Sequence, residues 1–217
     1  LCEKPFVYDP EVPSAELMRQ ARSLFSLAED KGLRLGICTQ YAVAARFFQT
    51  LWNERRGNEP IVQYDGFLET PAKNRPPDAV RIWSDLAPHL LSVLLCLAPD
   101  GQLDEASLSK TFTGYRAEAQ FRYLSSGTEI ACRLCASNFT EGSAHQRIFT
   151  YNGYTFRVEG QADTNGVYCS RIETADGPFV RPDTMRVLIR EFLSGHCVAT
   201  PAQCLRNLEL MLRVQDW

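Results

Sequence analysis

Three polar residues have types and positions that suit proton transfer. Asp85 and His89 are four residues apart in a stretch expected to be helical, so their side chains share one helix face. A carboxylate near an imidazole raises the basicity of the ring and can fix its tautomer. Lys4 follows an expected strand end, where open α/β sheets bind their ligands. Together these residues predict acid–base chemistry on a bound nucleotide or substrate.

Each residue also has a purely structural interpretation. A single lysine is usually a surface residue, and Asp85 suits the N-cap of its helix. His89 could equally be a structural histidine whose hydrogen bonds are satisfied at a helix end. We interpret His145 and His196 as structural or exposed. Only the combination of Lys4, Asp85 and His89 therefore points to a site.

The first forty residues predict the end of a parallel α/β unit. Leu1 and Cys2 read as the tail of a buried strand, and apolar residues at helical spacing predict an amphipathic helix over residues 14–31. Ser14 is expected to cap this helix, and Gly32 is expected to end it. Residues 33–38 then read as a short strand. Because crossover helices join parallel strands, this order is typical of a doubly wound unit.

The remainder predicts a larger antiparallel unit. From residue 115 apolar residues alternate, and Asn152-Gly153 between two such runs is a strong hairpin signal. The other expected elements are a helix over 42–55, a strand over 61–70, a buried helix over 86–97 with Pro88 in its first turn, and helices over 182–194 and 201–214. The predicted class is α+β: the end of a Rossmann-like parallel α/β unit (residues 1–40), then a large, mostly antiparallel open sheet with helices on one face (residues 41–217).

The composition of the chain argues against two classes of binding partner, nucleic acids and membranes. The 217 residues carry a net charge of -3, so no basic excess favours nucleic acid. The longest apolar stretch, near Leu90–Leu97, is too short to span a bilayer. The N-terminus does not resemble a signal peptide, because it has no basic region followed by an apolar run. We expect a cytoplasmic protein with a small-molecule partner, without nucleic acid or membrane.

The eight cysteines are scattered, which indicates free thiols in a reducing compartment. Cys132 and Cys135 lie three residues apart on an expected strand, so their side chains point to opposite faces. No second pair completes a zinc site, and we predict no metal and no haem.

Two motifs resemble those of a known family. Glu3-Lys4-Pro5 at a strand end is similar to the E-K-P motif of the Gfo/Idh/MocA oxidoreductases. Asp85-Leu86-Ala87-Pro88-His89 resembles the family's D-x-x-x-H motif at about the expected distance. The order of elements between them, including a strand ending in Gln40-Tyr41, is also similar. The resemblance covers essentially the whole chain.

The resemblance implies hydride transfer between NAD or NADP and a carbinol carbon of a sugar or polyol. Lys4 would lie between nicotinamide and substrate and lower the pKa of the reacting hydroxyl, and His89 would take its proton. Asp85 would orient the substrate or the imidazole. Glu3, Lys4 and Pro5 would contact the cofactor, and Gln40 and Tyr41 the substrate. The open sheet would pack against a partner subunit, which implies a homo-oligomer.

Two departures leave an alternative. The sequence contains no G-x-G-x-x-G loop to grip a pyrophosphate, and it begins with Leu1, so we expect a piece of a longer protein that binds NAD(P) poorly alone. Tyr41 is followed by residues 42–46, AVAAR, whereas many family members place an arginine nearer the tyrosine. The alternative is a non-catalytic binding, sensor or assembly module that keeps the fold.

Overall fold

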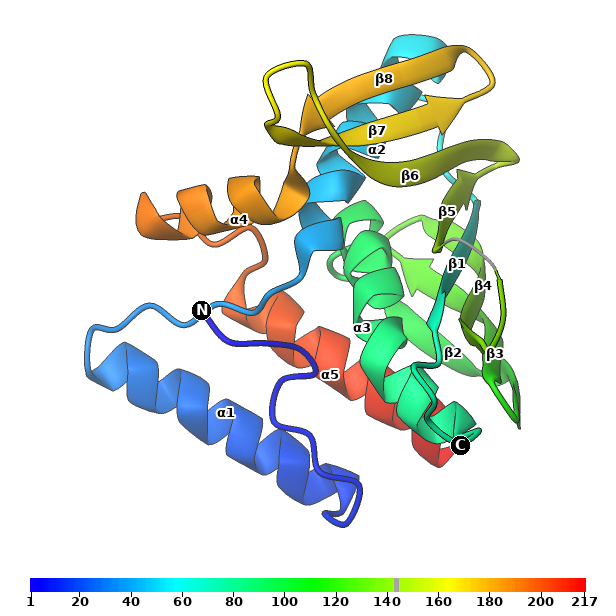
Figure 1. Ribbon diagram of the computed structural model, residues 1–217. Helices are drawn as coiled ribbons and strands as arrows, with labels where there is room; N and C mark the ends of the chain where they lie inside the picture. Colours follow the sequence, from blue (N-terminus) through cyan, green and yellow to red (C-terminus); the bar gives the residue numbers. More distant parts are fainter. Residues whose placement is uncertain (143–144) are drawn as a thin grey trace.

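The described residues, 1–142 and 145–217, form five helices and eight strands in this computed structural model (Figure 1). In chain order the elements are α1 (Ser14–Asp30), α2 (Gln40–Arg56), β1 (Gln63–Pro71), α3 (Ala79–Leu97), β2 (Gln102–Thr113), β3 (Arg116–Ser125), β4 (Thr128–Phe139), β5 (Gln146–Tyr151), β6 (Tyr154–Ala162), β7 (Tyr168–Thr174), β8 (Gly177–Pro182), α4 (Thr184–Leu193) and α5 (Pro201–Asp216). The alternating pattern in the sequence predicted strands only from residue 115, whereas β2 already begins at Gln102.

All eight strands belong to one sheet in the order β2-β3-β4-β1-β5-β6-β7-β8. Strand β1 lies inside it, parallel to β4 and antiparallel to β5, and the other neighbouring pairs are antiparallel. The chain leaves β1, passes through α3, β2 and β3, and returns as β4, so α3 is part of the connection between the parallel strands. The predicted open, mostly antiparallel sheet is confirmed.

The helices cover one face of this sheet and leave the other open (Figure 1). Helix α3 packs on the strands from β1 to β4, with α2 and α5 beside it. In α2, Phe48 stacks on Phe156 at 4.8 Å and contacts Phe149 at 5.1 Å between ring centroids. The residues of β3 alternate between buried and exposed, as a strand with one covered face requires. The core therefore lies between the sheet and these three helices.

The hairpin predicted at Asn152-Gly153 is confirmed. Both residues have positive φ, 45° and 83°, and Tyr151 pairs with Tyr154 across the turn. The Asn152 side chain also accepts hydrogen bonds of 2.9 Å from the backbone N–H groups of Val62 and Gln63. One asparagine thus closes the β5–β6 hairpin and fixes it to the start of β1.

The N-terminal segment differs from the prediction in its helix cap and in its second strand. Helix α1 and its end at Gly32 are confirmed, but Ser14 is the first helical residue, and Pro13 occupies the cap position without a side-chain bond. The strand predicted over residues 33–38 is wrong: only one parallel bridge joins Cys2 and Ile37. Within the described parts of the chain, this bridge stands apart from the eight-stranded sheet.

Helix α3 begins at Ala79, not at residue 86. Its N-cap is Asp78, whose side chain accepts from the backbone N–H of Arg81 at 2.9 Å. Asp85 therefore lies mid-helix, and Pro88 is inside the helix rather than in its first turn. The predicted strand end at Gln40-Tyr41 is also wrong, because α2 begins at Gln40.

By length and composition, α3 is the one described helix that could cross a membrane, and 72% of its most apolar window is buried in this fold. Its hydrophobicity matches its position, because it packs on four strands and on α2 and α5. A central helix of a protein core has the same character.

Gly66 on β1 allows α3 to approach the sheet, which leads to the first prediction. A Cβ at Gly66 would lie 2.9 Å from Leu90 Cδ2 and 2.8 Å from the Tyr64 hydroxyl, which itself donates to the Leu90 carbonyl. We expect Gly66→Ala to lower the free energy of unfolding by about 1–3 kcal/mol, measured by urea denaturation. Ala131→Ser, a change of similar size on the exposed face of β4, should change it by less than about 0.5 kcal/mol. Equal stabilities of the two variants would contradict this packing argument.

Candidate functional site

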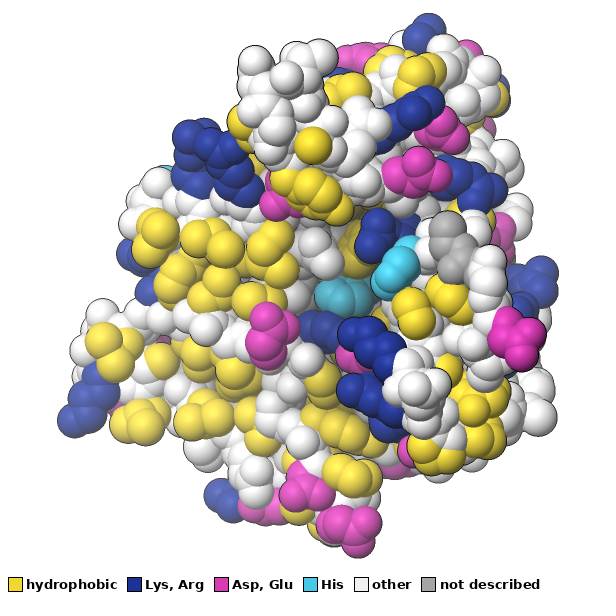
Figure 2. All heavy atoms as spheres, in the orientation of Figure 1, with side chains coloured by type: hydrophobic (Ala, Val, Ile, Leu, Met, Phe, Trp, Pro, Cys, Tyr) yellow, Lys and Arg dark blue, Asp and Glu magenta, His cyan; other side chains and the backbone are white. Residues whose placement is uncertain are grey.

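Residues from four separate segments meet at one place on the helix-covered side of the protein. Lys4 comes from the N-terminal segment, Tyr41 from the first turn of α2, Asp85 and His89 from the middle of α3, and Arg147 from β5. We call these five residues the lysine–histidine site. Figure 2 shows histidine side chains together with Lys and Arg side chains around a hollow in the middle of this face.

An ion pair between Lys4 and Asp85 joins the N-terminal segment to α3. The Lys4 Nζ atom lies 2.6 Å from Asp85 Oδ1 and also donates to the backbone carbonyl of Asp85. The Lys4 side chain is 13% exposed and the Asp85 side chain 47% exposed. Two acceptors on one residue thus hold a largely buried ammonium group in position, while one side of the pair faces solvent.

Pro88 lies three residues after Asp85 in the same helix. A proline has no N–H, so the helix hydrogen bond to the carbonyl four residues earlier, that of Ser84, is missing. Asp85 belongs to the turn that precedes Pro88, and its carbonyl accepts from Lys4. The carbonyl of Pro88 accepts from Asn207 Nδ2 on α5 at 2.8 Å. Neighbouring elements therefore supply hydrogen bonds around the proline.

His89 is buried, with 9% of its surface exposed, and its Nδ1 atom has no hydrogen-bond partner. Its ring packs edge-on against Tyr41 at 4.9 Å between centroids. Burial lowers the pKa of His89 well below 6.5, and the positive charges of Lys4 and Arg147 lower it further. The expectation that Asp85 raises the basicity of His89 is wrong, because the Asp85 carboxylate pairs with Lys4. The imidazole is accordingly neutral near pH 7.

The other residues predicted for the site have different surroundings. Tyr41 is buried between His89 and Phe149, and burial raises its pKa to about 12. Gln40 accepts a hydrogen bond of 3.3 Å from Thr184 Oγ1, which connects it to the first turn of α4. Glu3 is exposed near Cys38. Pro5 is half-buried and lines, with Lys4, a cavity of about 10 Å³.

Sequence reasoning missed Arg147. In β5 it has the same parity as the buried residues Phe149 and Tyr151, which places it on the helix-covered face. Its charge acts on both His89 and Tyr41. The available signal was a charged residue at an inward position of the alternating run that precedes Asn152-Gly153.

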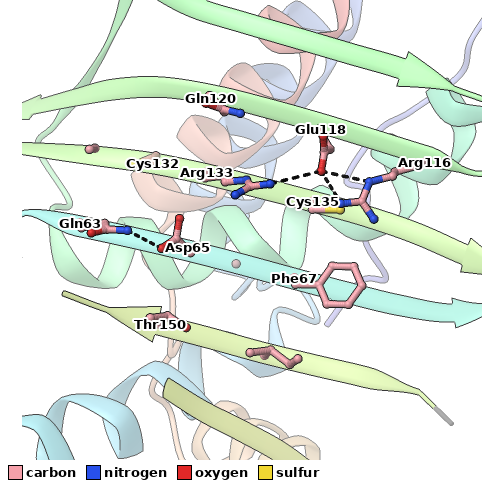
Figure 3. A pocket seen from close by; sticks show the side chains of 13 residues that line it. Gln63, Asp65, Phe67, Arg116, Glu118, Gln120, Cys132, Arg133, Cys135 and Thr150 are labelled. Atoms are coloured by element: carbon pink, nitrogen blue, oxygen red, sulfur yellow. Dashed lines mark hydrogen bonds and ion pairs between the residues drawn. The ribbon is translucent and has the colours of Figure 1, made fainter. Parts of the chain in front are cut away.

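A much larger hollow lies elsewhere, on the open face of the sheet. It has a volume of about 670 Å³ and contains neither Lys4 nor His89 in its lining. Figure 3 shows that its walls are strand residues, with Glu118 contacting Arg116, Arg133 and Cys135. We place the candidate chemistry at the lysine–histidine site because the buried imidazole and the ion pair are there.

Both cysteines border that open-face hollow along β4. The Cys132 side chain nevertheless belongs to the buried core under the helices, beside its register partner Tyr64, whereas Cys135 has the parity of the exposed Arg133. The prediction that the two thiols point to opposite faces is thus confirmed. Within the described parts of the chain, no three His, Cys, Asp or Glu side chains lie close enough together to hold a metal ion.

Comparison with solved structures identifies the fold. The UDP-N-acetylglucosamine 3-dehydrogenase of Acidithiobacillus ferrooxidans is 18% identical, with a TM-score of 0.66 over 99% of this chain and 68% of that chain. A 3-ketoreductase from Actinomadura kijaniata, solved with TDP-benzene and NADP, is 19% identical, with a TM-score of 0.60 over 97% of this chain and 67% of that chain. Apo scyllo-inositol dehydrogenase from Lactobacillus casei is 13% identical, with a TM-score of 0.62 over 99% and 68%.

No family model matches the sequence, and no curated protein sequence matches it. At these identities the three structures establish a shared fold for this chain. The chemistry of the lysine–histidine site has to be argued from its own residues.

The neutral state of His89 predicts a pH dependence of stability. In the unfolded chain the ring takes up a proton near pH 6.5, whereas in the folded chain it does so only at lower pH. The unfolded state therefore binds more protons in this window, and stability falls as pH falls. We expect wild type to lose stability more steeply than His89→Gln as the pH falls below 6.5, with a difference in slope that approaches about 1.4 kcal/mol per pH unit, measured by urea denaturation.

His145, whose pKa is also lowered by burial, Arg147 and Lys73, is present in both proteins and cancels in this comparison. Parallel stability curves for wild type and His89→Gln between pH 7.5 and 5.5 would show that the buried ring is not held neutral.

Proposed function

We propose that this chain is the catalytic and substrate-binding portion of an NAD(P)-dependent oxidoreductase that transfers hydride to or from a carbinol carbon of a sugar or polyol. The observation that carries the proposal is the convergence of the Lys4–Asp85 ion pair with the buried, neutral His89. The shared fold supports it, since the structural neighbours include two dehydrogenases and a ketoreductase.

The residues present fit the nicotinamide end of the cofactor. The Lys4 ammonium is largely buried and held by Asp85, and the buried Nδ1 atom of His89 has no hydrogen-bond partner, so a polar ligand group beside them would be recognised by both. Glu3, Lys4 and Pro5 would line the cofactor side, and Tyr41 the substrate side, with Gln40 beside it. Nicotinamide, when bound, supplies the hydride chemistry.

This chain's own residues handle the proton and the orientation. The Lys4 ammonium, held by Asp85, lowers the pKa of a substrate hydroxyl placed beside it. The neutral His89 imidazole accepts the hydroxyl proton during oxidation and returns it during reduction. Asp85 acts as a positioning residue, because it fixes the ammonium. Tyr41 packs against the imidazole and limits its rotation.

We further propose that residues 1–40 are the closing portion of a Rossmann-like nucleotide-binding unit and residues 41–217 the substrate and dimerisation domain. The parallel bridge between Cys2 and Ile37 encloses α1, as in a crossover unit. Exposed apolar side chains gather over α1 and α4 (Figure 2), among them Leu24, Leu27 and Leu193. Such a patch suits a further packed element.

The activity prediction concerns Lys4 and His89. We expect His89→Gln and Lys4→Ala each to lower kcat/KM by about 10²–10⁴, because one loses the proton acceptor and the other the charge beside the hydroxyl. The assay is NAD and NADP reduction against a panel of sugars and polyols, using the chain together with any residues encoded before Leu1. Lys31→Ala, an exposed change after α1, is the control.

Full turnover by both variants would show that these roles are wrong. If the chain neither binds nor reduces NAD(P) with any compound in the panel, the non-catalytic binding or sensor module becomes the better interpretation.

We also propose that two copies of the chain pack through the open face of the sheet. Phe67 and Ile148 line the hollow there beside the Arg116–Glu118 pair (Figure 3). A single-layer face that mixes apolar and charged side chains resembles the surfaces by which subunits associate. The other face is not available, since the helices cover it.

A charge at the centre of this face should separate the copies. We expect Phe67→Asp to convert a dimer into a monomer, measured as molar mass by light scattering. Leu24→Asp, the same kind of change in the exposed patch on α1, should leave the mass unaltered. A wild-type protein that is monomeric at every concentration would refute the proposed interface.

A further inference from the structure

Arg147 differs from most arginines of this chain in having no acceptor. Within the described residues its side chain forms no hydrogen bond or ion pair, although it is only partly exposed. By contrast, Arg46 pairs with Glu191 at 2.9 Å and Arg206 with Glu209 at 2.7 Å. Removing a guanidinium from water without a partner costs free energy, so such a group is usually compensated by a ligand or a counter-charge.

The position of Arg147 connects it with the lysine–histidine site. Its positive charge helps to lower the pKa of His89 and of His145, and it offsets part of the rise that burial gives the pKa of Tyr41. All three side chains therefore lie within its electrostatic reach. Its register partner Leu68 is buried on the helix-covered face of β1. Arg147 therefore stands on the sheet side of the site, on a different element from the ammonium of Lys4.

The local charge balance is positive. Asp85 is the carboxylate of the site, and it is already paired with Lys4. His89 is neutral and buried with its Nδ1 unpartnered. Lys73 acts on His145 in the same direction as Arg147. Figure 2 shows the same gathering of Lys, Arg and His side chains. The site thus holds cationic charge that its own residues do not balance.

We infer that Arg147 binds an oxyanion, a carboxylate or phosphate group, on the substrate, and so selects anionic over neutral polyols. The planar guanidinium offers paired N–H donors that match two oxygens of such a group. The inference rests on the proposed function and names the substrate class for the same site. It makes Arg147 a binding residue, which places the oxidised carbon between the anionic group and the Lys4–His89 pair.

The test measures binding and needs no turnover. The probes are D-glucuronate, D-glucose 6-phosphate and D-glucose, titrated by calorimetry into wild type, Arg147→Gln, Arg147→Lys and the exposed control Arg22→Gln. We expect at least one anion to bind wild type about tenfold or more tighter than glucose. Arg147→Gln should remove this preference, Arg147→Lys should retain part of it, and Arg22→Gln should keep all of it. The two anions distinguish a carboxylate from a phosphate.

The inference is overturned if neither anion binds wild type more tightly than glucose, or if Arg147→Gln keeps the preference with an unchanged melting temperature. If Arg147→Gln melts early, Arg147→Lys decides: a reduced or lost preference at native stability supports recognition by the guanidinium, and an unchanged preference contradicts it. An Arg147-dependent anion preference without NAD(P) reduction would leave the anion site standing while the hydride-transfer proposal fails. Equal reduction of NAD(P) by neutral and anionic polyols would support the hydride-transfer proposal and contradict the anion site.

Discussion

The ion pair between Lys4 and Asp85 connects two segments that are 81 positions apart in the sequence, and the geometry of the candidate site depends on it. A lysine on an N-terminal segment anchored by one β-bridge would otherwise have many conformations. Because Asp85 offers both its carboxylate and its backbone carbonyl, the ammonium is held at one point above α3. Pro88 removes one helix hydrogen bond in that turn, the one to the Ser84 carbonyl. His89 follows on the same face, so position and charge are set together.

The charges of the site differ in how they are compensated. Lys4 has an acidic partner, whereas Arg147 approaches the buried imidazole from β5 without one. Two cations and a low-dielectric environment act on His89 in the same direction, which favours the neutral ring. A neutral imidazole beside a fixed ammonium is a combination that suits removal of a proton from a hydroxyl. Burial thus produces the electrostatics from which the proposed chemistry is argued.

The two faces of the sheet differ in what covers them and in the residues that they carry. One face packs aromatic and aliphatic side chains against α2 and α3 and thereby fixes the elements that bear His89, Tyr41 and Arg147. The other face carries charged pairs and a wide hollow with no helix over it. Since strand residues alternate between the faces, a single strand such as β5 contributes Arg147 to one side and Ile148 to the other.

Periodicity and turn chemistry in the sequence determined the α+β class, helix α1, the hairpin at Asn152-Gly153 and the opposite orientation of Cys132 and Cys135, because these features depend on local spacing. The same local rules misplaced the start of α3 and gave residues 33–38 a strand, because a proline and a short apolar run are ambiguous without their neighbours. The sequence singled out Lys4, Asp85 and His89 but not their surroundings. Only the tertiary structure decided that Asp85 serves Lys4 and not His89, and that Arg147 joins them. The reason is that pairing and burial of charges depend on distances between segments far apart in the chain, which spacing along the sequence does not specify.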